Sequence, residues 1–256
     1  MKKLIAFDLD GTLAPSKSLL PNQIGLLLNQ LLDHFQVCII SGGKYDIFVE
    51  NVLTNKELDK NKFKNLHLMP TCGTRYYVYE NNKWIKVYSE DFSKSEKKQI
   101  IEALQKGFEE SGYKEIETYG ELIEDRESQI TLSTLGQDII RLLGKKGLQI
   151  KEDWDPNDHK KRIICDLVQP LIPEFEVKVG GLTSIDVTKP GIDKAYGMKK
   201  IMEHLNIKKE DILFIGDHLQ EGGNDYPVKA FGIDSLEISS WQETAVAIQT
   251  ILYIIK

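Results

Sequence analysis

Short apolar runs alternate with amphipathic segments along the first seventy residues of the chain. The runs have the length and composition of buried strands in a parallel sheet, and the segments between them carry apolar residues at helical spacing. The predicted strands are residues 4–7, 35–40 and 66–69, and the predicted helices are residues 21–32 and 44–53. This strand–helix order with short connections predicts a parallel sheet with right-handed crossovers.

The pattern between about residues 75 and 188 predicts antiparallel structure instead. Alternating apolar and polar residues flank Asn81-Asn82 and Gly180-Gly181, which are typical hairpin turns. Two helices and one strand are predicted between these hairpins. The predicted elements are strands 75–79, 84–88, 128–133, 174–179 and 183–187, and helices 93–112 and 157–171. Such an order predicts an α+β module with helices on one face of its sheet.

Parallel character returns at Asp193. Helices are predicted at 194–205 and 241–255, a strand at 211–215, and the start of another strand at 230–232. The simplest architecture is an α/β fold with one inserted domain. Residues 1–81 and 189–256 would form a parallel-sheet core domain, and residues 82–188 an α+β domain.

Composition narrows the classes of partner and compartment. The chain has 256 residues and a formal net charge of -6, which disfavours nucleic acid or an anionic membrane surface as a partner. No apolar run approaches the ~20 residues that cross a bilayer. The three cysteines, Cys38, Cys72 and Cys165, are scattered, which is typical of a reducing compartment. We therefore expect a cytoplasmic protein.

Polar side chains gather where the predicted parallel strands end. These are Asp8, Asp10, Ser41, Lys194, Asp217 and Asp225. The carboxyl ends of parallel strands lie at one edge of a sheet, where ligands usually bind. A carboxylate nucleophile, a second carboxylate, a hydroxyl, a cation and acidic metal ligands together suit phosphoryl transfer. Taken singly, each residue has an ordinary alternative as a turn former, a helix cap or a solvated surface residue.

The run from Asp8 to Leu13, Asp-Leu-Asp-Gly-Thr-Leu, resembles the nucleophile motif of the haloacid dehalogenase superfamily of phosphotransferases. Three further motifs of that superfamily follow in order. They are similar to Ile-Ile-Ser41-Gly-Gly, Lys-Pro-Gly-Ile-Asp-Lys194-Ala, and Phe-Ile-Gly-Asp217 with Gly-Gly-Asn-Asp225. The resemblance implies a Rossmann-like core.

The same resemblance implies a role for each motif residue. Asp8 would be the nucleophile and Asp10 the general acid and base, with the Asp10 carbonyl also on magnesium. Ser41, with Gly42 beside it, and Lys194 would hold the transferring phosphoryl group. Asp217 and Asp225 would complete the acidic Mg²⁺ site, because oxygen ligands suit that ion.

The inserted domain lies between the second and third motifs, as the C2-type cap does in subfamily IIB of the superfamily. The extended loop 216–225 resembles that of the eukaryotic-type phosphomannomutases. This implies substrate contacts from Lys17, Arg126, Ser184 and Asp186, a phosphorylated sugar as the partner, and a homodimer formed through the cap. The ordinary alternative for Arg126 is a surface ion pair with a nearby glutamate.

Two departures favour hydrolysis over isomerisation. Lys17 and Gln137 stand where the mutases have arginine. Lysine lacks the two-pronged grip of a guanidinium on phosphate, and glutamine lacks the charge. Since a mutase must retain its bisphosphate intermediate, we expect a Mg²⁺-dependent phosphatase acting on a small phosphorylated metabolite, through an aspartyl-phosphate. The alternatives are a phosphomannomutase and a non-catalytic sugar-phosphate sensor, which would have no need for Asp10.

Overall fold

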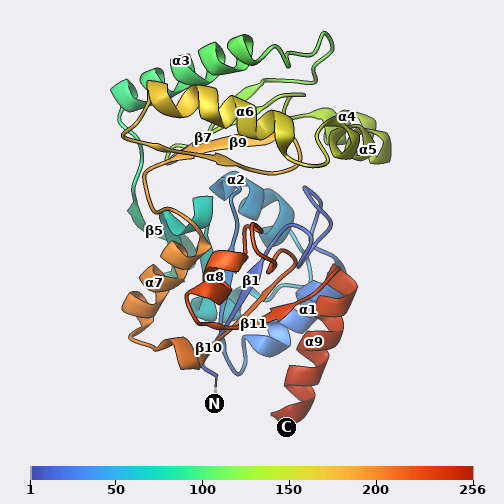
Figure 1. Cartoon of the computed structure of the whole chain (residues 1–256). Helices are drawn as coiled ribbons and strands as arrows, with labels where there is room; N and C mark the ends of the chain where they lie inside the picture. The colour runs from blue at the N-terminus through green and yellow to red at the C-terminus, as the bar shows by residue number, and fades with distance from the viewer. Residues whose placement is uncertain (1, 256) are drawn as a thin grey trace. The chain divides into compact units, whose positions relative to one another are not determined.

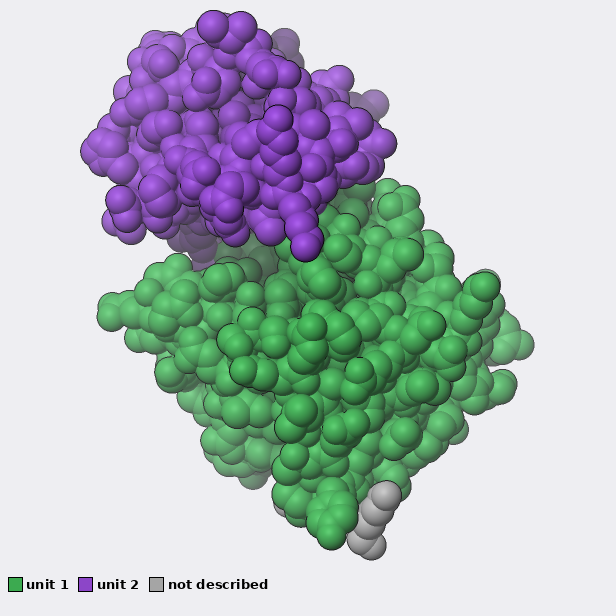
Figure 2. All heavy atoms as spheres, turned by 90° about the vertical axis from the view of Figure 1, so that its right-hand side faces the viewer, with its two compact units in different colours: residues 1–89, 192–256 green, residues 90–191 purple. Residues whose placement is uncertain are grey.

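The computed structural model describes residues 2–255, which divide into two compact units (Figures 1 and 2). Unit 1 extends to Ser89 and resumes at Ile192, and unit 2 comprises residues 90–191. The first boundary lies after residue 89 and not after residue 81, because the second strand of the first hairpin pairs within the sheet of unit 1. The second lies after residue 191 and not after residue 188. The second strand of the first hairpin, which the predicted boundary placed in the inserted domain, therefore belongs to the core sheet.

Unit 1 is built on a seven-stranded sheet with the strand order β11-β10-β1-β2-β3-β4-β5. The first five strands in this order pair in parallel, which confirms the predicted α/β fold, and β4 and β5 add an antiparallel edge. The strands are β1 (Leu4–Asp8), β2 (Gln36–Ile40), β3 (Leu66–Met69), β4 (Arg75–Glu80), β5 (Lys83–Ser89), β10 (Ile212–Gly216) and β11 (Asp234–Glu237). β11 begins later than predicted, because Ala230 still belongs to a helix and Gly232 turns the chain at φ +91°.

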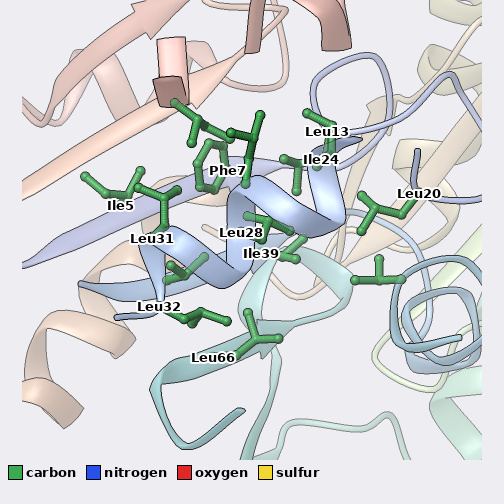
Figure 3. Packing of buried hydrophobic residues seen from close by; sticks show 14 of the residues in the cluster. Ile5, Phe7, Leu13, Leu20, Ile24, Leu28, Leu31, Leu32, Ile39 and Leu66 are labelled. Atoms are coloured by element: carbon green, nitrogen blue, oxygen red, sulfur yellow. The ribbon is translucent and has the colours of Figure 1, made fainter. Parts of the chain in front are cut away.

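Helices cover both faces of this sheet. Its strands alternate sides, so Ile5 and Phe7 of β1 pack toward α1 and α9, and Leu4 and Ala6 toward α7 and α8. Figure 3 shows Ile5 and Phe7 among leucines of α1. Each fully buried side chain of this size contributes about 1.5–3 kcal/mol. The helices are α1 (Asn22–Leu31), α2 (Tyr45–Phe48), α7 (Lys194–Leu205), α8 (Tyr226–Ala230) and α9 (Trp241–Ile254), with short helical turns η1 (Val49–Leu53), η2 (Lys60–Asn65), η3 (Thr71–Gly73) and η5 (Lys209–Asp211).

Unit 2 has a four-stranded antiparallel sheet in the order β6-β7-β9-β8, with α3 and α6 on one face (Figure 1). Ile130, Leu132, Ile185 and Val187 point into a separate apolar core under these helices. The opposite face is polar. The elements are β6 (Ile123–Asp125), β7 (Gln129–Ser133), β8 (Glu176–Val179), β9 (Ser184–Thr188), α3 (Lys94–Ser111), α4 (Ile139–Leu143), α5 (Lys145–Trp154), α6 (His159–Val168) and η4 (Gln169–Leu171).

Between residues 2 and 255, the helices are all too short or too polar to cross a membrane.

A buried histidine in unit 1 makes stability depend on pH. His67 of β3 lies 2.7 Å from the Tyr76 hydroxyl and 2.8 Å from Oε1 of Gln36. Burial, aided by the nearby charge of His204, lowers the pKa of His67 from 6.5 to about 4. The folded state thus favours neutral His67, whereas the unfolded chain takes up a proton near pH 6.5.

We expect acid to destabilise the fold through His67. The free energy of unfolding should fall as the pH is lowered from 6.5 toward 4, by at most about 3 kcal/mol from this group. Denaturant unfolding at several pH values measures the slope. His67→Gln removes the titrating group, so its slope should be shallower than that of the wild type over this range. Parallel slopes would contradict the assignment.

Candidate active site

The alternating directions of the side chains along β1 determine the face of the sheet on which Asp8 lies. Asp8 shares the face of Leu4 and Ala6, which is covered by α7. Lys194 opens α7, and Asp193 caps this helix by accepting a 2.8 Å hydrogen bond from the N–H of Tyr196. The side chain of Lys194 is fully buried, and its Nζ donates to Asp8 Oδ1 at 2.5 Å. The sheet and one helix start therefore bring these two residues together.

Two further carboxylates follow β10. Lys194 Nζ also donates to Asp225 Oδ1 at 2.6 Å, and Asp225 Oδ2 accepts from the N–H of His218 at 3.0 Å. Asp217 comes directly after the strand and approaches Gly11 so closely that a Cβ there would lie 2.1 Å from Asp217 Oδ2. Gly11 also has φ +85°, so only glycine fits without strain. We call Asp8, Lys194, Asp217 and Asp225 the acid–lysine cluster.

The charges of the cluster do not balance. Burial raises the pKa of Asp8 to about 8, with the charges of Asp225 and Asp10 adding to the rise and Lys194 opposing it. Burial likewise raises the pKa of Asp217. Although burial opposes its charge, Asp8 and Asp225 together raise the pKa of Lys194. Three carboxylates thus lie close together with one ammonium group, which among them contacts only Asp8 and Asp225, so their charged forms repel one another.

This repulsion and the donor atoms fit a hard divalent cation. Asp8, Asp217 and Asp225 each offer an oxygen, and these oxygens all lie within 4.8 Å of one another. All-oxygen ligands are those that Mg²⁺ takes in proteins, and a cation among them relieves the mutual repulsion of the carboxylates. The cluster can therefore hold a metal ion.

The other predicted core residues lie in the loops beside the cluster. The Asp10 carboxylate accepts a 2.6 Å hydrogen bond from the backbone N–H of Lys17, whose side chain is exposed. Ser41 directly follows Ile40, the residue opposite Asp8 in the sheet register, and is buried. Its hydroxyl accepts from the N–H of Gly43 at 3.1 Å.

Three residues of the inserted unit were also predicted as substrate contacts. Arg126 Nε donates to Glu124 Oε2 at 2.8 Å, which is the ion pair that the ordinary alternative expected. Ser184 and Asp186 lie on β9, and Asp186 Oδ1 accepts from the hydroxyl of Thr131 at 2.7 Å. Their roles toward a substrate stay predictions.

The sequence did not indicate the turn η3, which supports the Ser41 loop. Thr71, Cys72 and Gly73 all have positive φ, at 49°, 55° and 84°. Such strain persists only where its surroundings hold it in place, and it gathers at functional sites. Here the N–H of Thr71 donates to the Gly43 carbonyl at 3.0 Å and that of Cys72 to the Ser41 carbonyl at 2.9 Å. Residue types could not have predicted three consecutive left-handed residues here, because two of them are Thr and Cys, which rarely adopt positive φ.

Replacing Gly73 should destabilise unit 1 strongly. An added Cβ would lie 2.4 Å from the Cα of Gly197, so the new methyl group would clash with the backbone of α7. We expect Gly73→Ala to lower the free energy of unfolding by about 3 kcal/mol, through strain at positive φ plus the clash. Gly222→Ala is the matched control, because Gly222 has φ +85° and open space around it, and should cost about 1 kcal/mol. Equal losses in denaturant unfolding would exclude the close contact.

Comparisons with known proteins identify the family of the chain. The family model for haloacid dehalogenase-like hydrolases matches residues 5–227. A phosphomannomutase from Encephalitozoon cuniculi is 27% identical over 237 residues, covering 89% of this chain and 84% of its own. Phosphomannomutase 1 of Mus musculus is 24% identical, covering 89% and 83%.

Solved structures share the fold. The IMP-bound, N-terminally truncated IMP-nucleotidase of Plasmodium falciparum aligns with a TM-score of 0.66 at 19% identity, covering 98% of this chain and 68% of that one. A haloacid dehalogenase-like hydrolase from Bacteroides thetaiotaomicron gives 0.64 at 16% identity, covering 98% and 100%. Because the family model spans the acid–lysine cluster and most of the sheet that carries it, the chain belongs to the haloacid dehalogenase-like hydrolase family.

Proposed function

We propose that this protein is a magnesium-dependent phosphatase that hydrolyses a small phosphorylated metabolite, namely a sugar phosphate. The observation that carries the proposal is the acid–lysine cluster, in which Lys194 lies 2.5 Å from the oxygen of the proposed nucleophile Asp8. A buried carboxylate paired with a fixed ammonium group and flanked by metal-type ligands suits attack on a phosphoryl group.

The proposed reaction has two steps. An Asp8 oxygen attacks phosphorus while Asp10 donates a proton to the leaving oxygen, so that the P–O bond to the sugar breaks and an aspartyl-phosphate forms. Asp10 then takes a proton from water, whose oxygen attacks the same phosphorus and releases phosphate and free Asp8. Ser41, Gly42 and Lys194 hold the phosphoryl oxygens throughout.

A divalent ion would be held by Asp8, Asp217 and Asp225, with the Asp10 carbonyl as a further ligand. When bound, Mg²⁺ neutralises charge on the phosphoryl oxygens. Asp217 and Asp225 follow a strand that pairs directly with β1, so their loop and the Asp8 loop leave the sheet at the same edge.

Arg126, Ser184, Asp186 and Lys17 are our proposed contacts to the rest of the substrate. Lys17 and Gln137 replace arginines of the mutases, which favours hydrolysis over return of the phosphoryl group. The similarity to phosphomannomutases supports the second candidate, interconversion of mannose 6-phosphate and mannose 1-phosphate.

One experiment separates the two candidates. Hexose and pentose phosphates are incubated with the protein and Mg²⁺, with and without a catalytic amount of hexose 1,6-bisphosphate, and both free phosphate and positional isomers are followed. Phosphate release without isomerisation supports the phosphatase. Bisphosphate-dependent isomerisation with little phosphate release would establish the mutase, and binding without any turnover would indicate a sensor.

A further inference from the structure

The peptide between Thr12 and Leu13 is held at both of its polar ends. The Leu13 N–H donates to the Leu9 carbonyl at 2.9 Å, and the Thr12 carbonyl accepts from the Thr244 hydroxyl at 2.7 Å. Because this peptide cannot rotate without losing one of the two bonds, the orientation of Thr12 is fixed as well. Both threonines are fully buried.

The fixed residue stands between two members of the acid–lysine cluster. The Thr12 hydroxyl lies 3.5 Å from Asp8 Oδ2 and 3.4 Å from Asp217 Oδ1. The preceding residue, Gly11, lies so close to Asp217 that an added Cβ would be 2.1 Å from Asp217 Oδ2. A small rotation of the loop from Gly11 to Thr12 would therefore change the spacing between Asp8 and Asp217.

The first turn of α9 and the residues just before it contact both loops that carry acidic residues. Thr244 lies in the first turn of this helix, where its N–H donates to the carbonyl of Ser240 at 3.1 Å. Just before the helix, the N–H of Ile238 donates to the carbonyl of Gly216, next to Asp217, at 3.1 Å. Buried Ala245 and Ile248 fix the helix in the core. One continuous segment, residues 238–244, thus bonds to the Asp8 side and to the Asp217 side of the cluster.

We propose that Thr244 is a positioning residue that sets the distance between Asp8 and Asp217, and through it the affinity for a divalent ion and the rate of phosphoryl transfer. Only the expected effect on the rate of phosphoryl transfer rests on the proposed function. Thr244 lies outside residues 5–227, the part that the family model covers, and belongs to none of the sequence motifs described above. The competing explanation is that its hydroxyl only attaches α9 to the core.

The test compares three variants in the full chain. Thr244→Val keeps the shape and removes the donor, whereas Thr244→Ser keeps the donor and removes a methyl group. Thr250→Val is the control, because the Thr250 hydroxyl donates to the Val246 carbonyl within the same helix at 2.9 Å and reaches no loop of the site. Mn²⁺ binding is measured from the electron paramagnetic resonance signal of the free ion, and kcat and KM with a phosphate monoester and Mg²⁺.

We expect Thr244→Val to weaken Mn²⁺ binding and to lower kcat, each by about tenfold, with little change in KM. Thr244→Ser and Thr250→Val should stay close to the wild type in all three quantities. A purely structural bond would change the unfolding midpoint but leave Mn²⁺ affinity as in Thr250→Val, and that result overturns the proposal. Equal impairment in Thr244→Ser would overturn it too.

The two proposals can fail separately. If the wild type hydrolyses no phosphate monoester while Thr244→Val still weakens Mn²⁺ binding, the proposed function fails and the positioning role stands. If Thr244→Val does not fold, Thr244→Ala provides the same comparison, since it also lacks the donor and adds no bulk.

Discussion

Asp8→Asn should fold normally and lose turnover by about 10⁴-fold or more, because an amide oxygen is a poor nucleophile toward phosphorus. Stability should not fall, since the change removes a carboxylate whose pKa burial has raised to about 8, and Lys194 keeps Asp225 as its partner. Steady-state kinetics measure the loss. Intact-protein mass spectrometry after rapid quenching should detect a phosphorylated species in the wild type and none in the variant.

The control for this variant is Asp46→Asn. Asp46 is exposed in the first turn of α2 and should be replaceable without effect on turnover. If Asp8→Asn retained one percent or more of the wild-type rate, Asp8 would not be the nucleophile, and the whole two-step reaction would have to be abandoned.

Lys194→Met should lower both the turnover and the stability of the protein. It leaves Asp8 and Asp225 buried without their shared partner, which typically costs about 3–5 kcal/mol. Turnover should fall about 10²- to 10³-fold, because the ammonium group no longer faces the developing phosphoryl charge. Denaturant unfolding and kinetics at a temperature where the variant is folded measure the two effects separately.

A second substitution tests the electrostatic cause. Asp225→Asn added to Lys194→Met removes one of the stranded charges, so it should restore part of the free energy of unfolding and none of the turnover. Lys209→Met is the control lysine, because Lys209 Nζ donates to the carbonyl of Phe231 and neutralises no carboxylate of the cluster. A Lys194→Met protein as stable as Lys209→Met would show that the cluster is not under electrostatic strain.

The strand ends of the core could be predicted because short-range pattern determines them. β1 is apolar until its last residue, so Asp8 had to lie at the edge of a buried sheet. Short-range pattern does not determine which sheet a hairpin joins. β4 reaches the core sheet through the pairing of Tyr77 with Leu68, and the alternation of residues 75–88 would look the same in either unit.

Other features were missed because their signals are weak or not local. Helices α4 and α5 were not predicted, since Gly144 and Gly147 interrupt the helical pattern there. Thr12 was visible within the first motif, but its place between two carboxylates depends on the return of the chain at Asp217. Thr244 looks like any helical threonine until its bond to the first loop is seen.

The position of β1 in the sheet also has a consequence while the chain is being synthesised. One neighbour of β1 is β2, available almost at once, but the other is β10, which begins at Ile212. At about 5–20 residues per second, the ribosome needs roughly 10–40 s to deliver that partner. For all this time the nascent chain carries an apolar strand with one open edge, a template for pairing with other chains. Protection by chaperones on the ribosome should therefore affect the yield of this protein more than its equilibrium stability would suggest.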